Sequence, residues 1–523
     1  MDHTDISSAT LLAIASAAVA ETDGTPEAVA AHVAKRLDPD GVASAFARGL
    51  AELAAYGAAG WTAGDTAVEA EVEAVAASRR IVQPLFEAKL QARLDALDGA
   101  HRGRNRCPTC EQNGASRGRL RRQWTSTVGT VSLRRRCARC ATATCEGGFA
   151  PAQNAIGLPD GEFTARFEEV CTLLGTTVPF GMATGLLAKL CGIEPSIKAV
   201  QDMTDRRGEA VLHLEAEQAE ACAPFDETGL PVPMQQRPPN TVEPAAAPNV
   251  AYVEMDGVVP ITREELTGKE LTPTERRRQQ RAKKAKVRGG KGKRYRIVGR
   301  EVKNAVLYDG KDCTDQSPGR GCILSKSYVS YLGDWQRFAA LLWVAMLRLR
   351  FDQAKLLVVL SDGAEWVRSI CKWLPVPTFL ILDLFHVKHR VWEVSRSLHG
   401  EHSPKAAQWA QVQCDRVEAG NARKVIEALR FLQPTRAETR ELVRLLGNYL
   451  EANLDRMDYP AYRARGLRVG SGAVESANFH VTGTRLKLQG MRWSEEGARQ
   501  MATLRADLFN RNHEARTREI LAS

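Results

Sequence analysis

The second half of the chain has the hydrophobic pattern of an α/β domain. Five stretches show the apolar runs or the alternation that are typical of strands. They lie at residues 250–255, 295–308, 323–332, 356–360 and 378–382. Apolar residues at helical spacing over 335–351 predict a helix before the fourth strand, and a second helix is expected through Ile370. The predicted order is strand, strand, strand, helix, strand, helix, strand.

Helical patterns dominate the rest of the chain. Residues 1–100 are rich in alanine, and five apolar residues there share one helical face. These are Ile81, Leu85, Leu90, Leu94 and Leu97. Residues 160–222 and 385–455 also have helical patterns, and the last helices are expected at 472–489 and 494–512. Residues 224–248 are rich in proline and predict a linker or an extended crossover.

Composition and charge narrow the classes of function. The chain is 44% hydrophobic and 26% charged, as is usual for a soluble globular protein, and its net charge is +10. A basic surplus favours an anionic partner, nucleic acid first and an acidic membrane second. No apolar run is long enough to span a bilayer, and the apolar stretch 11–20 lacks the positive flank of a signal peptide. We therefore expect a cytoplasmic protein whose cysteines are thiols or metal ligands.

Two Cys-x-x-Cys pairs predict a zinc ribbon. Cys107 and Cys110 form the first pair, Cys137 and Cys140 the second, with 26 residues between the pairs. Two residues between thiolates allow both sulfurs to bind one tetrahedral ion, and four sulfurs make a closed structural zinc site. The segment 127–133 has the composition of a β-hairpin arm. Cys145 is an alternative ligand that we take as spare, and a redox pair is the alternative function.

Arginines are dense around these cysteines. Eleven of them lie within the segment: Arg102, Arg104, Arg106, Arg117, Arg119, Arg121, Arg122, Arg134, Arg135, Arg136 and Arg139. Arginines on a small rigid scaffold suit phosphate contacts, which add affinity without reading sequence. Arg134, Arg135 and Arg136 are the predicted DNA-binding residues, and the alternative is a merely solvated basic face.

Three carboxylates suggest a divalent metal site. Asp256 and Asp362 each follow an apolar run and precede glycine, at the expected ends of the first and fourth strands. Glu475 follows Gly470 and Gly472 in the first turns of a predicted helix, with Ser471 as the expected N-cap. Oxygen donors of this kind fit Mg²⁺ or Mn²⁺, and two such ions can activate an attacking oxygen and stabilise a leaving one. The alternative is that all three serve only caps and turns.

At these residues the sequence resembles the bacterial insertion-sequence transposases of the ISKra family. The resemblance covers about half of the chain, from near 250 to 510. The blocks that carry it are Tyr252-Val-Glu-Met-Asp256-Gly, Leu360-Ser-Asp362-Gly-Ala-Glu-Trp366, Leu382-Asp-Leu-Phe-His386, Gly466-Leu-Arg-Val-Gly-Ser-Gly-Ala-Val-Glu475-Ser and Arg485-Leu-Lys-Leu-Gln-Gly-Met-Arg-Trp493. The upstream cysteine pairs resemble those of the family too.

The resemblance implies an α/β fold with an RNase H-like mixed sheet, in which the strands bearing Asp256 and Asp362 are neighbours. It implies that Asp256, Asp362 and Glu475 are a catalytic DDE triad that binds Mg²⁺ or Mn²⁺. The segment Asp383-Leu-Phe-His386 resembles the Asp/Cys-x-x-His signature of Mutator-like transposases. His386 is therefore expected to support the active site near the scissile phosphate, with a core histidine as the alternative.

The predicted organisation follows from these patterns together with the resemblance. In order, we expect an Ala-rich helical region (1–100), a zinc ribbon (101–150), a helical region (151–223), a linker (224–249), the first part of the catalytic core (250–386) with a basic loop (263–296), an all-helical insertion (387–465), and the final part of the core with C-terminal helices (466–523). The dense basic run 276–296 predicts a flexible segment that neutralises the DNA backbone.

Further DNA contacts are expected in two places. Residues 186–200 have the order helix, glycine turn and serine-capped helix of a helix-turn-helix. Arg485, Lys487 and Arg492 follow Glu475 and are predicted to hold the strand being cut, whereas Trp493 is expected to pack.

The predicted function is that of a DNA transposase that binds terminal inverted repeats and catalyses strand cleavage and strand transfer. Its partners would be the element ends and target DNA, bound by a homodimer or a larger assembly without a membrane. Two alternatives stay open: a metal-dependent nuclease on the same fold, and a non-catalytic zinc-ribbon DNA-binding regulator.

Overall fold

The chain divides into two compact units, Met1–Thr204 and Asp205–Ile520. The computed structural model describes residues 25, 28, 42–59, 66–100, 106–107, 109–140, 142, 145, 147–238, 246–265, 274, 277, 295–317 and 320–510. Most of the predicted basic loop 263–296, including nearly all of the run 276–296, lies outside these residues. Within the described residues, no helix is long and apolar enough to cross a membrane.

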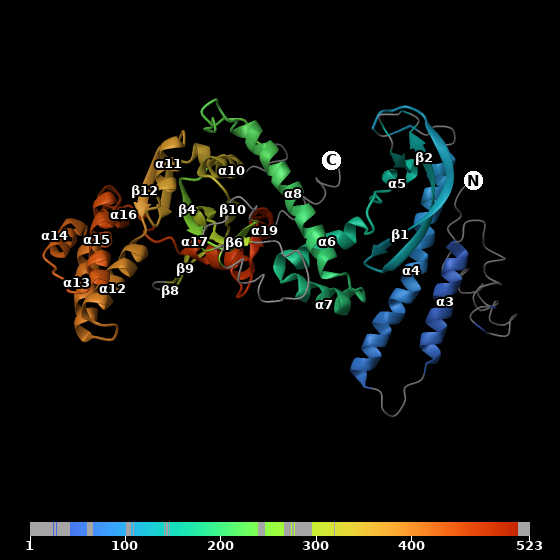
Figure 1. The fold of residues 1–523 in the computed structure, drawn as a ribbon, viewed down its shortest axis with the longest axis horizontal. Coiled ribbons are helices and arrows are strands. Elements are labelled where there is room, and N and C mark those ends of the chain that lie inside the picture. The colour runs from blue at the N-terminus through green and yellow to red at the C-terminus, as the bar shows by residue number, and fades with distance from the viewer. Residues whose placement is uncertain are drawn as a thin grey trace. The chain divides into compact units, whose positions relative to one another are not determined.

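In the first unit, helices α3 (Val42–Ala58) and α4 (Ala67–Ala100) pack against each other (Figure 1). The predicted apolar stripe of α4 meets two partners. Ile81 and Leu85 lie against Gly49 of α3. Farther along the helix, Leu94 is buried in a small core with Trp124. The helical N-terminal region is thus confirmed where the structure describes it.

A long β-ribbon packs on α4. Strands β1 (Gly114–Ser126), β2 (Gly129–Cys140) and β3 (Gly148–Phe149) form an antiparallel sheet in the order β1-β2-β3. The predicted hairpin over 127–133 is confirmed and extends much farther on both sides.

Polar side chains of α4 bond the backbone of every second residue on one edge of β2. Gln83 donates to the Thr130 carbonyl at 2.7 Å, and Gln91 both donates to the Arg134 carbonyl and accepts from the Arg134 N–H. Glu87 accepts from the Ser132 N–H at 2.8 Å. Exposed strand edges invite pairing with other chains, so these bonds protect β2 along this part of its length.

The unit continues with helices α5 (Pro151–Ala155), α6 (Ala165–Thr177), α7 (Phe180–Cys191) and the start of α8 (Ile197–Cys222), which continues into the second unit from Asp205. α7 ends at Gly192, whose φ of 63° is left-handed, and the Ser196 hydroxyl accepts from the Ala199 N–H at 3.1 Å. The expected sequence of helix, glycine turn and serine-capped helix is therefore present. Its role in DNA recognition stays a prediction.

The centre of the second unit is a five-stranded mixed sheet in the order β10-β7-β4-β11-β12. The strands are β4 (Val250–Val258), β7 (Val302–Asp309), β10 (Ser327–Leu332), β11 (Leu356–Ser361) and β12 (Thr378–Leu382). β4, β11 and β12 are parallel, whereas β7 and β10 each run antiparallel to their neighbour.

The predicted strand 295–308 is in fact two strands. β6 (Tyr295–Gly299) leaves the main sheet and pairs with β5 (Ile261–Glu265), while β13 (Trp493–Ser494) lies on the other side of β5. β8 (Cys313–Ser317) and β9 (Arg320–Ile323) form a separate hairpin. Composition alone does not reveal this split, because both pieces have strand character.

Helices cover both faces of the main sheet. α10 (Trp335–Arg348) and α11 (Glu365–Trp373) pack with Ala251, Val253 and Met255 of β4. Alternate residues of β4 point to the other face, where Tyr252 packs in a core with α12 (Leu384–His399) and α17 (Gly472–Ala477).

The stretch 387–465 is helical, as predicted. It begins with α12 and continues beyond β12, at one edge of the sheet (Figure 1). Its further helices are α13 (Pro404–Glu418), α14 (Ala422–Arg430), α15 (Ala437–Ala452) and α16 (Tyr459–Ala464). The chain then returns to the sheet through α17, a π-helical turn η4 (Asn478–Gly483), α18 (Thr484–Leu486) and α19 (Glu495–Phe509).

Residues 224–238 of the predicted linker form an extended crossover that is bonded to helices of the second unit. The indole N–H of Trp343 donates to the Met234 carbonyl at 2.8 Å. That of Trp373 donates to the Pro231 carbonyl at 2.5 Å. These bonds satisfy two tryptophan donors that would otherwise be buried without partners.

Candidate active site and zinc site

Asp256 and Asp362 lie side by side on neighbouring parallel strands. The last residue pair between β4 and β11 joins Met255 to Ser361, so the two aspartates are the next residues along. Positions 252, 254 and 256 of β4 alternate with those that pack on α10. Positions 358 and 360 of β11 do the same, and Asp362, directly after the strand, continues their alternation. Both carboxylates therefore belong to the face covered by α12 and α17. One detail is corrected: β4 runs on to Val258, so Asp256 lies inside its strand.

Asp256 is held by two hydrogen bonds. Its Oδ1 accepts from the Gly257 N–H at 2.7 Å, and its Oδ2 accepts from the Asn478 amide at 2.5 Å. Its pKa is raised to about 6, first by burial and also by the negative charge of Asp362, although both hydrogen bonds oppose the rise. A raised pKa marks a carboxylate that lacks enough positive charge nearby, which is the setting a divalent cation would relieve.

The turn after β11 fixes Asp362. Its Oδ1 accepts from the Ala364 N–H at 3.0 Å, and its carbonyl accepts from the Tyr449 hydroxyl at 2.7 Å. Gly363 has a φ of 99°, and a Cβ there would lie 3.1 Å from both Leu382 and Tyr449. Only glycine combines this backbone with so little space, which explains the Asp-Gly pair.

Glu475 comes from α17 and meets a second group of ligand-type side chains. The His386 Nδ1 lies 3.6 Å from the Glu475 Oε1 and 3.3 Å from the Asp383 Oδ2. Ligand atoms of these three residues all lie within 4.8 Å of one another. Among the described residues, the only other group of at least three that meets this spacing is the cysteine cluster. The three carboxylates of the predicted triad thus do not form such a group by themselves.

His386 connects the two parts of the site electrostatically. Its pKa is raised, mainly by Asp383 and further by the charges of Asp256 and Asp362, while partial burial opposes the rise. The positive form is therefore favoured beside the carboxylates. Glu475 itself is half exposed, at 51% of its side chain, and is accessible to an ion or a ligand.

Asp383 is a structural hub whose full role the sequence pattern did not show. Its buried carboxylate accepts from the N–H groups of Phe385 and His386, at 2.5 and 3.2 Å, and so caps α12. The same carboxylate accepts from the N–H of Ser471 at 2.8 Å and from its hydroxyl. Burial raises the pKa of Asp383, but the nearby His386 imidazole and the bonds from Ser471 outweigh burial and lower it.

These bonds correct the expected role of Ser471. It occupies the N-cap position of α17, but its hydroxyl makes no bond to the helix and donates to Asp383 instead. Asp383 therefore ties the start of α12 to the start of the helix that carries Glu475. Gly470 permits this close approach, since a Cβ there would lie 2.5 Å from the ring of Phe385.

We predict that Asp383→Ala lowers the free energy of unfolding of the protein by about 3–5 kcal/mol, the range for removing one partner of a buried charged cluster. The matched variant Ser471→Ala, which removes one donor, is expected to cost about 1–2 kcal/mol. Urea unfolding of both purified variants measures this. Equal midpoints for Asp383→Ala and the wild type would rule out the hub.

A buried polar network holds Asp256 from the neighbouring strand. Asn304 lies opposite Asp256 in the register of β7 and β4. Its amide donates to Asn478 at 2.7 Å and to Thr482 at 3.0 Å, while its oxygen accepts from the Ser330 hydroxyl at 2.6 Å. Asn478 in turn donates to Asp256. An asparagine inside the apolar run 302–308 was the one sequence signal for this network.

Glu254, two residues before Asp256, fastens α17 to the sheet. It is fully buried and accepts from the Tyr308 hydroxyl at 2.7 Å and from the Val474 N–H at 2.8 Å. Burial raises its pKa to about 7, while both bonds act in the opposite direction. Since Val474 precedes Glu475, this contact fixes the position of α17 relative to Asp256.

Four cysteines gather in the first unit as a candidate zinc site. Cys107, Cys110, Cys140 and Cys145 form the group. The sulfurs of Cys107 and Cys145 are 3.4 Å apart, and those of Cys110 and Cys140 are 3.3 Å apart. Zinc bonds of about 2.3 Å in a tetrahedron place sulfurs roughly 3.8 Å apart, so a small outward movement would accommodate the ion. Backbone N–H groups of Cys110 and Thr109 lower the pKa of Cys107 to about 6, which favours the thiolate that binds metal.

Cys137 is not a member of this group, and this corrects the predicted ligand set. Cys137 and Cys140 both lie in β2, which has no turn between them. Residues three apart in a strand point to opposite faces, so these two sulfurs cannot converge as in a knuckle. The Cys137 thiol instead lies 3.7 Å from the Arg135 carbonyl, and Cys145 is not spare but occupies the fourth position.

The predicted DNA-contacting residues after Glu475 separate into two kinds. Arg485 is fully buried, at 0% exposure, and its guanidinium lies 4.9 Å from the centre of the Trp493 ring. This corrects its assignment, because a buried side chain cannot reach a phosphate. Burial lowers the pKa of Arg485 to about 10. Trp493 packs as expected, whereas Lys487 and Arg492 are exposed and remain available to DNA.

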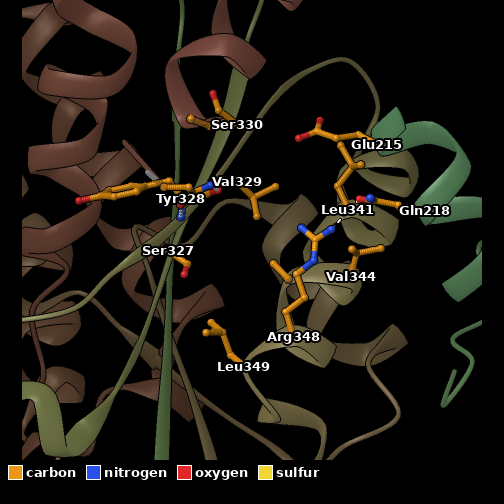
Figure 2. A pocket seen from close by; sticks show the side chains of 13 residues that line it. Glu215, Gln218, Ser327, Tyr328, Val329, Ser330, Leu341, Val344, Arg348 and Leu349 are labelled. Carbon is orange, nitrogen blue, oxygen red and sulfur yellow. Dashed lines mark hydrogen bonds between the residues drawn. The ribbon is translucent and has the colours of Figure 1, made fainter. Parts of the chain in front are cut away.

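A separate pocket opens between α8, β10 and α10, and Figure 2 shows its lining. Arg348 donates there to the Gln218 side chain at 2.7 Å. None of Asp256, Asp362, Asp383, His386 and Glu475 lines this pocket. It is therefore distinct from the carboxylate site.

Comparison with known proteins adds a family of unknown function. Residues 333–519 match the model of a family described as Uncharacterised protein family (UPF0236). The matched stretch contains Asp362, Asp383, His386 and Glu475. It begins after Asp256, which is therefore not included. No curated protein matches the chain.

Proposed function

We propose that this protein is the DNA transposase of an insertion sequence, with Asp256, Asp362 and Glu475 as its DDE triad. The observation that carries the proposal is the adjacent placement of Asp256 in β4 and Asp362 directly after β11, with Glu475 on a helix that packs on the same face. Two partly buried carboxylates side by side repel each other, so a structural role in turns does not account for their placement.

The architecture supports an RNase H-like catalytic domain. The first three strands run antiparallel to one another in the order β10-β7-β4, and β11 and β12 continue the sheet in parallel from β4. A helical segment then separates Asp362 from Glu475. These are the features that the resemblance to ISKra-family transposases implies.

The donor set fits hard divalent cations. Asp256, Asp362 and Glu475 offer only oxygen atoms, which suit Mg²⁺ or Mn²⁺. When bound, such ions supply an activated water or 3′-hydroxyl and stabilise the leaving oxygen. Asn478 and the Gly257 N–H orient Asp256 for this role, and Asp383 orients His386. The imidazolium of His386 adds positive charge next to the position of a scissile phosphate.

Strand transfer by the purified full-length chain tests this function. The substrate is a DNA end that flanks the gene, used both uncut and with its 3′ end already cleaved, with Mg²⁺ or Mn²⁺ and with EDTA as control. We expect metal-dependent joining of the cleaved end to target DNA. Metal-dependent cutting without joining would indicate a nuclease, and binding with neither reaction would indicate a DNA-binding regulator. Since two ends must be joined, the active assembly would be at least a homodimer.

A further inference from the structure

The β1–β2 ribbon carries arginines in register on one face. Arg119 pairs with Arg136 across the strands, and Arg121 pairs with Arg134. Directly opposed residues of antiparallel strands share a face, and so do residues two apart along a strand. The four arginines therefore share one face of the ribbon.

The opposite face is covered around Trp124. Trp124, Val131 and Leu133 alternate with the arginines and pack against Leu94 of α4. Arg135 belongs to this inner face, and its Nε atom is buried. α4 also bonds one edge of β2 and reaches the arginine face at Arg119, which pairs with Asp95, whereas Arg121 and Arg134 are exposed.

The charge on this face is poorly compensated. Arg119 makes an exposed ion pair with Asp95 at 2.9 Å. Arg121, Arg134 and Arg136 have no ion-pair partner among the residues that the structure describes. Like charges directly opposite each other on a sheet destabilise it, so this arrangement favours an anionic partner with repeated charges.

We propose that this arginine face binds the backbone phosphates of duplex DNA. This proposal rests on the proposed transposase function, because the duplex would be one end of the insertion sequence. Arginines two apart on a strand repeat every 6.8 Å or so, about twice the axial spacing of phosphates along one DNA strand. A β-ribbon also fits the dimensions of a DNA groove. Contacts of this kind fix position and add affinity without reading bases.

The structure refines the predicted DNA-binding set for this segment. Arg134 and Arg136 belong to the interface, Arg119 and Arg121 of the partner strand join them, and Arg135 does not. The alternation of β2 decides this, because three consecutive residues of a strand cannot all point to one face.

The test is a salt titration of binding to a random-sequence duplex by the full-length protein. The variant is Arg121→Gln, Arg134→Gln and Arg136→Gln combined. The control is Arg423→Gln, Lys424→Gln and Arg436→Gln combined, which removes the same charge from exposed positions in the helical insertion. Each phosphate contact contributes about 0.9 to the slope of log K against log salt, so the ribbon variant should lose about 2.7 from that slope.

We also expect the ribbon variant to bind the duplex at least tenfold more weakly near 100 mM salt. The control variant should keep the wild-type slope. The ribbon variant should unfold at the wild-type urea concentration or higher, because it removes like-charge repulsion. An unchanged slope would overturn the proposal, even if strand transfer by the wild type succeeds. The proposal would also be overturned if the ribbon variant lost affinity only for RNA or only for anionic vesicles, and not for duplex DNA. A reduced slope in a protein that joins no DNA would support the interface while sinking the catalytic proposal.

Discussion

Asp362→Asn is expected to abolish strand transfer while leaving the fold and DNA binding intact. The substitution keeps an oxygen that can accept the Ala364 N–H but removes the negative charge that would hold a divalent cation. Loss of about 4 kcal/mol or more of transition-state stabilisation corresponds to a rate lower by roughly a factor of 10³ or more. The measurement is the yield of joined product over time with Mg²⁺, beside the urea unfolding midpoint.

Asp455→Asn is the matched control for this prediction. Asp455 is 65% exposed at the surface of the same unit and lies 3.8 Å from Arg368. Surface substitutions of this kind change stability by less than about 0.5 kcal/mol, and we expect joining at the wild-type rate. Full activity of Asp362→Asn would exclude Asp362 as a metal ligand. Equal loss in both variants would indicate a general effect of charge on DNA binding.

Cys145→Ser is expected to remove zinc from the protein, whereas Cys137→Ser is expected to retain it. Cys145 completes the four-sulfur group, and Cys137 lies on the other face of β2. A closed zinc site in a small domain contributes about 10–16 kcal/mol of binding free energy, and three ligands hold the ion far less tightly than four. The measurement is zinc per chain after dialysis against a weak chelator, together with protease sensitivity of the ribbon.

Both serine variants replace one cysteine by a similar side chain, so each controls for the other. Zinc near one equivalent per chain in the wild type and Cys137→Ser, and near zero in Cys145→Ser, is the expected pattern. The reverse pattern would restore the set of two Cys-x-x-Cys pairs that the sequence predicted. Absence of zinc from the wild type would remove the zinc assignment altogether.

These two sites show where a sequence pattern is reliable. The strands at 250–255, 356–360 and 378–382 follow from mainly apolar runs, because a strand buried on both faces carries few polar side chains; Glu254 is the charged exception. Asp256 and Asp362 stand out for the same reason, since each breaks such a run just before a glycine. Once the strands that lead to Asp256 and Asp362 are neighbours, the alternation of side chains along each strand brings the two carboxylates to one face of the sheet.

Other features depend on distant contacts and escape such reasoning. Ser471 has the residue type and position of an N-cap, yet a carboxylate 88 residues away accepts its hydroxyl instead. Arg485 belongs to a basic stretch, yet packing against Trp493 buries it completely. Asn478 reaches Asp256 across 222 residues, and no local spacing announces that bond.

The sequence by itself determined the α/β pattern, the helical insertion, the cysteine-rich segment and the two strand carboxylates, because each rests on local periodicity or on short spacing. Only the tertiary structure decided that Cys145 replaces Cys137, that Asp383 joins α12 to the loop before α17, and which arginines of the ribbon face outward. The physical reason is common to all three. Strand direction, register and packing set where a side chain points, and these are properties of the assembled sheet and helices.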